Sequence, residues 1–255
     1  MYLKSDAIII NRRPFMNTSY VLFCYTERAG KLTVLAKGAA RRRKKAEPPS
    51  IPDLFQRGEV VLWFGRRRDY AILREWTLED MRPGLRSDYD AFRAASGCAA
   101  LVSELARGSD DPGEYYRGFD RALDVLARGA DPRPVLWSFS LKALTRAGFV
   151  APLSSCAACG SALAGKDRTV VSPSDGGLVC GACQSRLGDA EAPRLVLPPD
   201  AVGTARFLAT SSVEAAGNLR VSPRCAAALD RATVMLAEYH LETSMAILLP
   251  EGSRT

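Results

Sequence analysis

Two pairs of cysteines form the motif with the most specific chemistry in this chain. Cys156 and Cys159 flank two alanines, Cys180 and Cys183 flank a glycine and an alanine, and 20 residues separate the pairs. A tight turn can present both thiolates of a pair to one ion, and four sulfurs complete a tetrahedral zinc site with no place for water. The spacing therefore predicts one structural zinc ion. Two buried dithiols, a redox pair and an iron–sulfur site are the alternatives that the spacing leaves open.

The other side chains capable of chemistry are few. Cys24, Cys98 and Cys225 stand alone in apolar surroundings, which predicts small buried hydrophobic residues. The odd total of seven cysteines argues against a disulfide framework. His240 is the single histidine, so most chemistry with a histidine general base is disfavoured. The sequence also has no phosphate-binding loop, dinucleotide fingerprint, nucleophile elbow or metalloprotease motif. These observations favour a binding protein over an enzyme.

The positive charge of the chain is concentrated in its first third. Residues 1–80 hold 16 Lys/Arg and 9 Asp/Glu, whereas residues 81–255 hold 19 of each, so the whole net charge of +7 lies in the first part. Such asymmetry predicts a polyanionic partner, nucleic acid before an anionic membrane surface. A basic surface that is merely solvated is the alternative. The cations that we expect to contact nucleic acid are Lys37, Arg41, Arg42, Arg43, Lys44, Lys45, Arg66, Arg67 and Arg68.

Composition and the N-terminal residues indicate a folded protein and argue against a membrane-spanning or secreted one. With 255 residues, 47% hydrophobic and 25% charged, the chain is expected to fold into one large or two small domains. No apolar run is long enough to cross a membrane. The first residues lack the basic and apolar segments of a signal peptide. We therefore expect a cytoplasmic protein.

The elements that must position these side chains change type along the chain. β-Branched and aromatic runs predict five strands, and five strands with turns between them fit a small closed barrel. The expected strands cover residues 7–10, 19–26, 31–36, 59–64 and 70–74. The basic loop with two prolines, residues 37–50, lies between the third and fourth strands. We expect it to be mobile at the mouth of the barrel.

Beyond residue 83 the apolar spacing becomes helical. Caps and prolines predict helix starts at Ser87, at Asp111-Pro112, at Pro134 and at Ser222-Pro223. Gly176-Gly177, ahead of the second cysteine pair, predicts a hairpin. The fold class is therefore α+β: an N-terminal barrel followed by a helical domain into which the four-cysteine element is inserted.

Three stretches in this order resemble the recombination mediator RecO family. The first, residues 30–42, is similar to its third strand and basic loop. The second, residues 137–152, is similar to the helix that precedes its zinc segment. The third runs from Cys156-x-x-Cys159-Gly through Ser172-Pro-Ser-Asp-Gly-Gly to Cys180-x-x-Cys183. The resemblance rests on their order and spacing across nearly the whole chain.

The resemblance implies an OB-fold DNA-binding domain over residues 1–80 and a helical domain over residues 81–255, with a zinc segment inserted at 154–192. It implies binding of single- and double-stranded DNA and annealing of complementary strands. Its implied partners are RecR and the acidic C-terminal tail of single-strand binding protein (SSB), with RecA loaded indirectly and no membrane. It also implies a place at the nucleoid. A first guess for the tail's pocket is the region of Trp137 and Leu141, beside Lys142 or Arg146.

Two other classes remain as hypotheses. A nuclease is disfavoured because the chain has a single histidine and no cluster of carboxylates in its sequence. A zinc-ribbon RNA-binding or transcription-associated protein shares the cysteines and the basic charge. The relative affinity for single-stranded DNA and RNA separates it from a DNA mediator.

Overall fold

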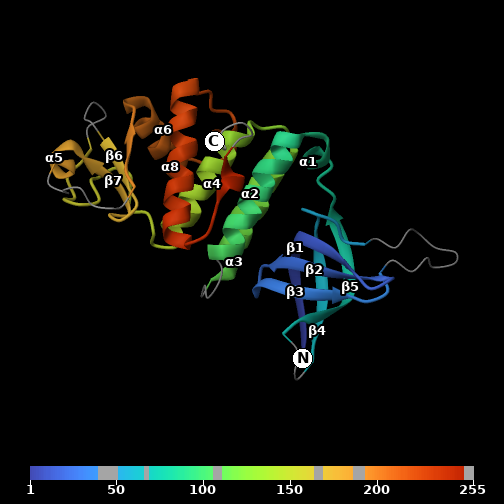
Figure 1. Cartoon of the computed structure of the whole chain (residues 1–255). Coiled ribbons are helices and arrows are strands. Elements are labelled where there is room, and N and C mark those ends of the chain that lie inside the picture. Colours follow the sequence, from blue (N-terminus) through green and yellow to red (C-terminus); the bar gives the residue numbers. More distant parts are fainter. Residues whose placement is uncertain (40–50, 66–68, 106–110, 164–168, 186–192, 250–255) are drawn as a thin grey trace.

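The computed structural model describes residues 1–39, 51–65, 69–105, 111–163, 169–185 and 193–249. Figure 1 shows three regions in a row: a β-barrel at one end, a layer of helices in the middle, and a small sheet beyond the helices. The N-terminus lies at the far end of the barrel. None of the helices among the described residues has the length and apolar character to cross a membrane.

The first region is a closed five-stranded barrel, which confirms the expected OB-like fold. Its strands follow the order β1-β2-β3-β5-β4, and β1 closes the barrel by pairing with β4. The pairing of β3 with β5 is parallel and all the other pairings are antiparallel. The strands are β1 Tyr2–Phe15, β2 Ser19–Thr26, β3 Gly30–Ala36, β4 Arg57–Phe64 and β5 Ala71–Asp80.

Alternation along β2 and β3 sorts side chains between the core and the outside of the barrel. Leu22, Cys24 and Val34 are fully buried in the barrel core. Phe23 and Lys31 fall on the opposite, outer face because successive side chains of a strand point to opposite sides. β1 is longer than expected, because the strand continues to Phe15 after a register shift between Ile9 and Asn11. The residues that follow the shift, 11–15, are mostly polar and exposed.

The middle region is built around α4 Pro132–Arg146, which packs against five other helices. Ten of its 15 residues are buried, including Trp137 and Leu144, so the apolar spacing of this helix serves the core. The neighbouring helices are α2 Tyr89–Leu105, α3 Pro112–Ala127, α6 Pro199–Thr210, α7 Val213–Gly217 and α8 Pro223–Leu241. The short helices α1 Gly84–Ser87 and η1 Ala246–Leu248 complete the region.

Two of the expected helix starts are confirmed and two are wrong by a few residues. Asp111 caps α3 and Ser222 caps α8, each with proline in the first turn. Asp88 caps α2 by accepting from the Ala91 amide at 3.0 Å, whereas the Ser87 hydroxyl bonds back to the Gly84 carbonyl. α4 begins at Pro132 behind Asp131; Pro134 belongs to the same first turn, where a second missing N–H costs nothing.

The small sheet has the strand order β7-β6-β8, with β6 Thr169–Ser172, β7 Gly177–Cys180 and β8 Leu195–Leu197. The hairpin between β6 and β7 turns at Gly176, whose φ of 70° favours glycine, as expected. Arg206 of α6 ties this region to the helices: its guanidinium donates to the Leu153 carbonyl at 2.8 Å and to the Leu163 carbonyl at 2.7 Å.

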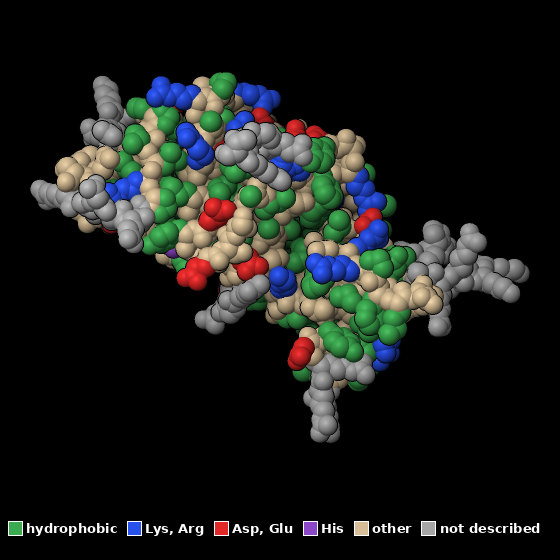
Figure 2. All heavy atoms as spheres, viewed as in Figure 1, with side chains coloured by type: hydrophobic (Ala, Val, Ile, Leu, Met, Phe, Trp, Pro, Cys, Tyr) green, Lys and Arg blue, Asp and Glu red, His purple; other side chains and the backbone are tan. Residues whose placement is uncertain are grey.

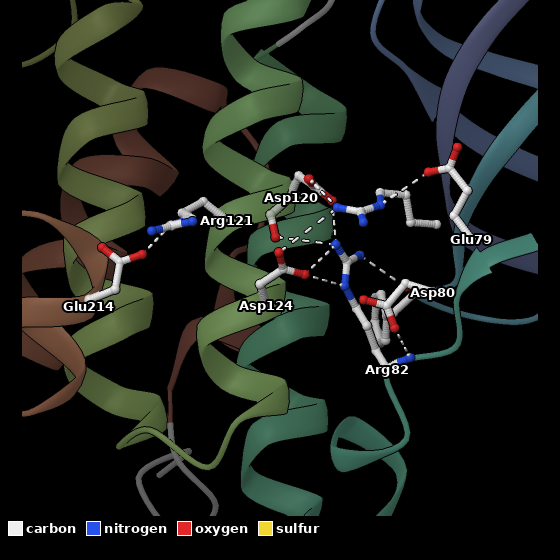
Figure 3. Close-up of polar contacts among 9 residues, drawn as sticks. Glu79, Asp80, Arg82, Asp120, Arg121, Asp124 and Glu214 are labelled. Carbon is white, nitrogen blue, oxygen red and sulfur yellow. Dashed lines mark hydrogen bonds and ion pairs between the residues drawn. The ribbon is translucent and has the colours of Figure 1, made fainter.

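A buried arginine joins the barrel to the helices (Figure 3). The Arg82 side chain is 1% exposed, and its Nε donates to Asp124 of α3 at 2.9 Å. Its Nη1 donates to the Phe55 carbonyl at 3.1 Å, and its Nη2 bonds both Asp120 and Asp124. Arg57 of β4 reaches Asp120 at 3.0 Å as well. We call these four side chains, Arg57, Arg82, Asp120 and Asp124, the junction cluster.

Candidate metal centre and nucleic-acid interface

The sulfurs of Cys156, Cys159, Cys180 and Cys183 form a compact cluster, all lying within 4.8 Å of one another. Cys159 Sγ and Cys180 Sγ are 4.0 Å apart. A tetrahedral ion with metal–sulfur bonds of about 2.3 Å would place its ligands about 3.8 Å apart. The donor set therefore fits one thiolate-bound metal ion with little movement.

Two backbone turns bring the cysteine pairs together. In the first, the Gly160 amide donates to the Cys156 carbonyl at 2.8 Å, with Gly160 at a φ of 74°. In the second, Cys180 ends β7 and the short helix α5 Gly181–Gln184 carries Cys183. The Ala157 amide donates to the Leu178 carbonyl at 2.8 Å and holds the two turns side by side. Backbone hydrogen bonds therefore bring the four cysteine side chains together.

The thiols of the cluster differ in pKa because they form hydrogen bonds with different neighbours. Hydrogen bonding with the Ser161 hydroxyl and amide lowers the pKa of Cys159 to about 6. Hydrogen bonding with Cys159 and then Cys180 raises the pKa of Cys183 to about 12, since the proton is shared with its neighbours. Four thiolates so close repel one another, and a bound divalent cation removes that repulsion.

The other three cysteines are buried as expected. Cys24 lies in the barrel core, and Cys98 and Cys225 lie in the helical core. Burial raises the pKa of Cys24 to about 12, which leaves it protonated and chemically inert.

The cations expected to contact DNA fall largely beyond what the structure describes. Lys37 is exposed at the end of β3. Arg41, Arg42, Arg43, Lys44, Lys45, Arg66, Arg67 and Arg68 lie outside the described residues.

Additional cations and aromatic rings lie together on the barrel, and sequence reasoning did not single them out. Arg13 lies 5.7 Å from the ring centre of Phe23, and Arg74 lies 5.3 Å from that of Trp63. Figure 2 shows basic side chains beside hydrophobic ones where the barrel meets the helices. The signal was the alternation of β1 and β2, which places Arg13 and Phe23 on one outer face. Rings and cations in this arrangement suit single-stranded nucleic acid.

The first guess for a peptide pocket near Trp137 is wrong. Trp137 and Leu141 are buried in the helical core, because α4 is surrounded by other helices. The Lys142 amine donates to the Ser211 carbonyl, and Arg146 pairs with Glu114. Among the residues that the structure describes, Trp137, Leu141, Lys142 and Arg146 therefore do not form an apolar surface with free cations.

Comparison with protein families matches both parts of the chain. Residues 1–82 match the family model described as recombination protein O N terminal. Residues 86–246 match the model described as recombination protein O C terminal. The first match ends at Arg82, and the second begins four residues later at Arg86.

Curated relatives agree over most of the length. A protein named DNA repair protein RecO from Rubrobacter xylanophilus is 28% identical over 251 residues, covering 98% of this chain and 96% of the relative. Proteins of the same name from Desulfitobacterium hafniense and Symbiobacterium thermophilum are each 28% identical, over 218 and 229 residues, covering 85% and 89% of this chain and 77% and 87% of the relatives. Since the family models match both parts in order, the chain belongs to the RecO family of DNA repair proteins.

Proposed function

We propose that this protein is a non-catalytic mediator of DNA repair and recombination. It binds single- and double-stranded DNA, anneals complementary strands and, with RecR, helps to load RecA onto DNA coated with SSB. It would act in the cytoplasm at the nucleoid. Family membership over the whole chain carries the proposal. Its units would be the DNA-binding domain 1–80 and the helical domain 81–255, with the zinc segment 154–192 inserted.

Charge neutralisation supplies a route to annealing. Two single strands repel through their phosphates, and a surface with local positive charge holds both at a lower electrostatic cost. Base pairing then provides the favourable step. The net charge of +7 lies within residues 1–80, which include the barrel. Because the sequence has no phosphate-binding loop, annealing is expected to proceed without ATP.

We further propose that the nine cations Lys37, Arg41–Lys45 and Arg66–Arg68 contact phosphates. Each phosphate contact on a single strand contributes about 0.7 to the slope of log affinity against log salt. Replacing Arg41, Arg42, Arg43, Lys44 and Lys45 by alanine should flatten that slope by roughly 3.5 if all five make contact. An unchanged slope would place the binding surface elsewhere on the barrel.

The metal of the four-cysteine cluster is proposed to be a single structural zinc ion. The support is the sulfur geometry and an all-thiolate donor set, which zinc accepts in closed tetrahedral sites. All four coordination positions are filled by protein, so the ion would hold the turns together and leave no site for a substrate. Elemental analysis of protein purified without chelator should find one zinc per chain, and finding none would contradict the assignment.

Engagement of SSB distinguishes this function from passive DNA binding. SSB covers the strand and blocks annealing, so the mediator must also bind SSB, and the acidic tail of SSB is the proposed contact. The test is annealing of complementary oligonucleotides coated with full-length or tail-deleted SSB, without ATP. We expect annealing only with full-length SSB. Equal rates with both coats would contradict tail docking, and a strict ATP requirement would contradict the non-catalytic mechanism.

The same preparation tests the alternative of an RNA-binding zinc-ribbon protein. A DNA mediator should bind a single-stranded DNA at least as tightly as the RNA of the same sequence. A strong preference for the RNA would favour the alternative, because the ribose 2′-hydroxyl is what lets a protein site select RNA.

A further inference from the structure

A groove of about 470 Å³ lies where the outer face of the barrel meets α2. One wall comes from β1, β2 and β3 and includes Arg13, Phe23 and Lys31. The facing wall comes from α2 and includes Ser96, Ala100 and Ser103, which recur at steps of four and three along the helix. The groove thus joins the outer barrel face to the helical region.

The barrel wall combines an aromatic ring with cations that have no carboxylate partner. Arg13 and Lys31 are exposed, and neither forms an ion pair within the part of the chain that the structure describes. Other barrel cations differ: Arg12 reaches Asp53 at 3.3 Å, and Lys4 reaches Glu59 at 3.0 Å. Positive charge at this wall is therefore available to an anionic ligand, with Phe23 between the two cations as a half-buried apolar surface.

The base of the groove is firmly held. Phe55 and Phe92 pack edge to face there, with ring centres 5.3 Å apart. Phe55 has a φ of 61°, a conformation that non-glycine residues rarely adopt. Its amide donates to the Ile9 carbonyl at 2.8 Å and its carbonyl accepts from Arg82 at 3.1 Å. These bonds hold the loop that forms the base of the groove.

We propose that this groove receives an unstacked base of single-stranded DNA. The base would lie against Phe23, between the barrel and the short side chains of α2, with Arg13 and Lys31 binding the phosphates on either side. Stacking on aromatic rings beside backbone cations is how single strands are held without sequence preference. A duplex keeps its bases paired and cannot fill the groove. This inference rests on the proposed function and adds α2 to the DNA path.

Filling the groove from the helix side is the sharpest test. Ala100→Trp places a large ring against the barrel wall, and Ala209→Trp on α6 is the matched control at another half-buried helical alanine. Binding of a fluorescein-labelled oligothymidylate of about 20 nucleotides is measured by anisotropy. Ala100→Trp should weaken binding about 5- to 150-fold, the effect of losing one stacked base. The salt slope should stay constant because the phosphate contacts remain.

Two further measurements make the test independent of folding. Phe23→Leu keeps apolar volume but removes the ring, so it should also weaken oligothymidylate binding while leaving an abasic oligonucleotide bound as by the wild type. The double variant Arg13→Gln and Lys31→Gln should flatten the slope of log affinity against log salt by about 1.4, with oligothymidylate and with the abasic oligonucleotide alike. Wild-type affinity for oligothymidylate in both Ala100→Trp and Phe23→Leu would overturn the inference.

The outcomes also separate this inference from the proposed function. If the wild-type protein does not bind single-stranded DNA, the proposed function fails. If it binds but the groove variants bind equally well, only the groove assignment fails. If Ala100→Trp keeps its DNA affinity but loses the SSB tail peptide, the groove is a peptide site and the base assignment is wrong.

Discussion

The junction cluster and the four-cysteine cluster hold closely packed ionisable side chains in opposite ways. At the junction, the charge of Arg82 is neutralised by Asp120 and Asp124 of the same chain. At the other end of the molecule, four sulfurs face one another and share protons. The first assembly is complete within the chain, whereas the second presents four sulfur ligands that could hold an external metal ion. Folding of the two regions should therefore respond differently to metal, salt and substitution.

At the junction cluster, the buried guanidinium of Arg82 has a hydrogen-bond partner for each of its nitrogens. All three guanidinium nitrogens of Arg82 donate hydrogen bonds, to two carboxylates and to the carbonyl of Phe55. Burying a charge is costly unless it is paired and fully hydrogen-bonded. Because the partners come from the barrel loop and from α3, the same bonds fix the barrel against the helices and hold the base of the groove.

The largest effect is expected from breaking the cysteine cluster. Cys156→Ser with Cys159→Ser leaves two ligands, and metal binding on the order of 10 kcal/mol is what folds comparable small zinc elements. We expect loss of the bound metal and unfolding of the sheet of β6, β7 and β8. Limited proteolysis and metal analysis measure both outcomes.

Cys225→Ala is the control for losing a thiol, because Cys225 is buried in the helical core away from the cluster. It should keep the metal and resist cleavage between residues 153 and 197. If the double variant stays equally resistant, the sheet folds without help from a metal.

A smaller effect is expected at the junction. Arg82→Met keeps much of the side-chain volume but leaves Asp120 and Asp124 without their buried partner, and should lower the free energy of unfolding by about 3 kcal/mol. Arg57 still reaches Asp120, so the loss should fall at the low end for a broken buried pair. Urea unfolding measures it. Adding Asp124→Asn should recover part of the loss, and a purely additive result would mean that the two residues act separately.

The sequence predicted local features of these regions better than distant ones. The cysteine pairs and Gly176-Gly177 indicated the four-sulfur cluster and its hairpin because each pair lies within four residues and the two pairs lie only 20 residues apart. The helix start at Ser87 was wrong because neighbouring Asp88 offers an equally good cap. Arg82 gave no signal: its partners lie 38 and 42 residues away, and arginine side chains are mostly exposed in proteins.

The smallest effect is expected for an exposed ion pair of the same chemistry. Arg121 on α3 pairs with Glu214 of α7, but their side chains are 58% and 37% exposed (Figure 3). Exposed pairs contribute roughly 0–1 kcal/mol because water screens them. Arg121→Met should therefore change the urea midpoint far less than Arg82→Met. Equal losses would show that burial does not set the strength of the junction.

Removing bound metal from the wild-type protein tests most directly whether the four-cysteine cluster depends on a metal ion and the junction cluster does not. Hydrogen exchange is measured peptide by peptide before and after treatment with a strong zinc chelator. We predict that residues 169–180 lose protection, while peptides covering β4, β5 and α3 around the junction cluster keep theirs. Unchanged protection at 169–180 after the metal has been removed, or equal loss at both places, would contradict the account.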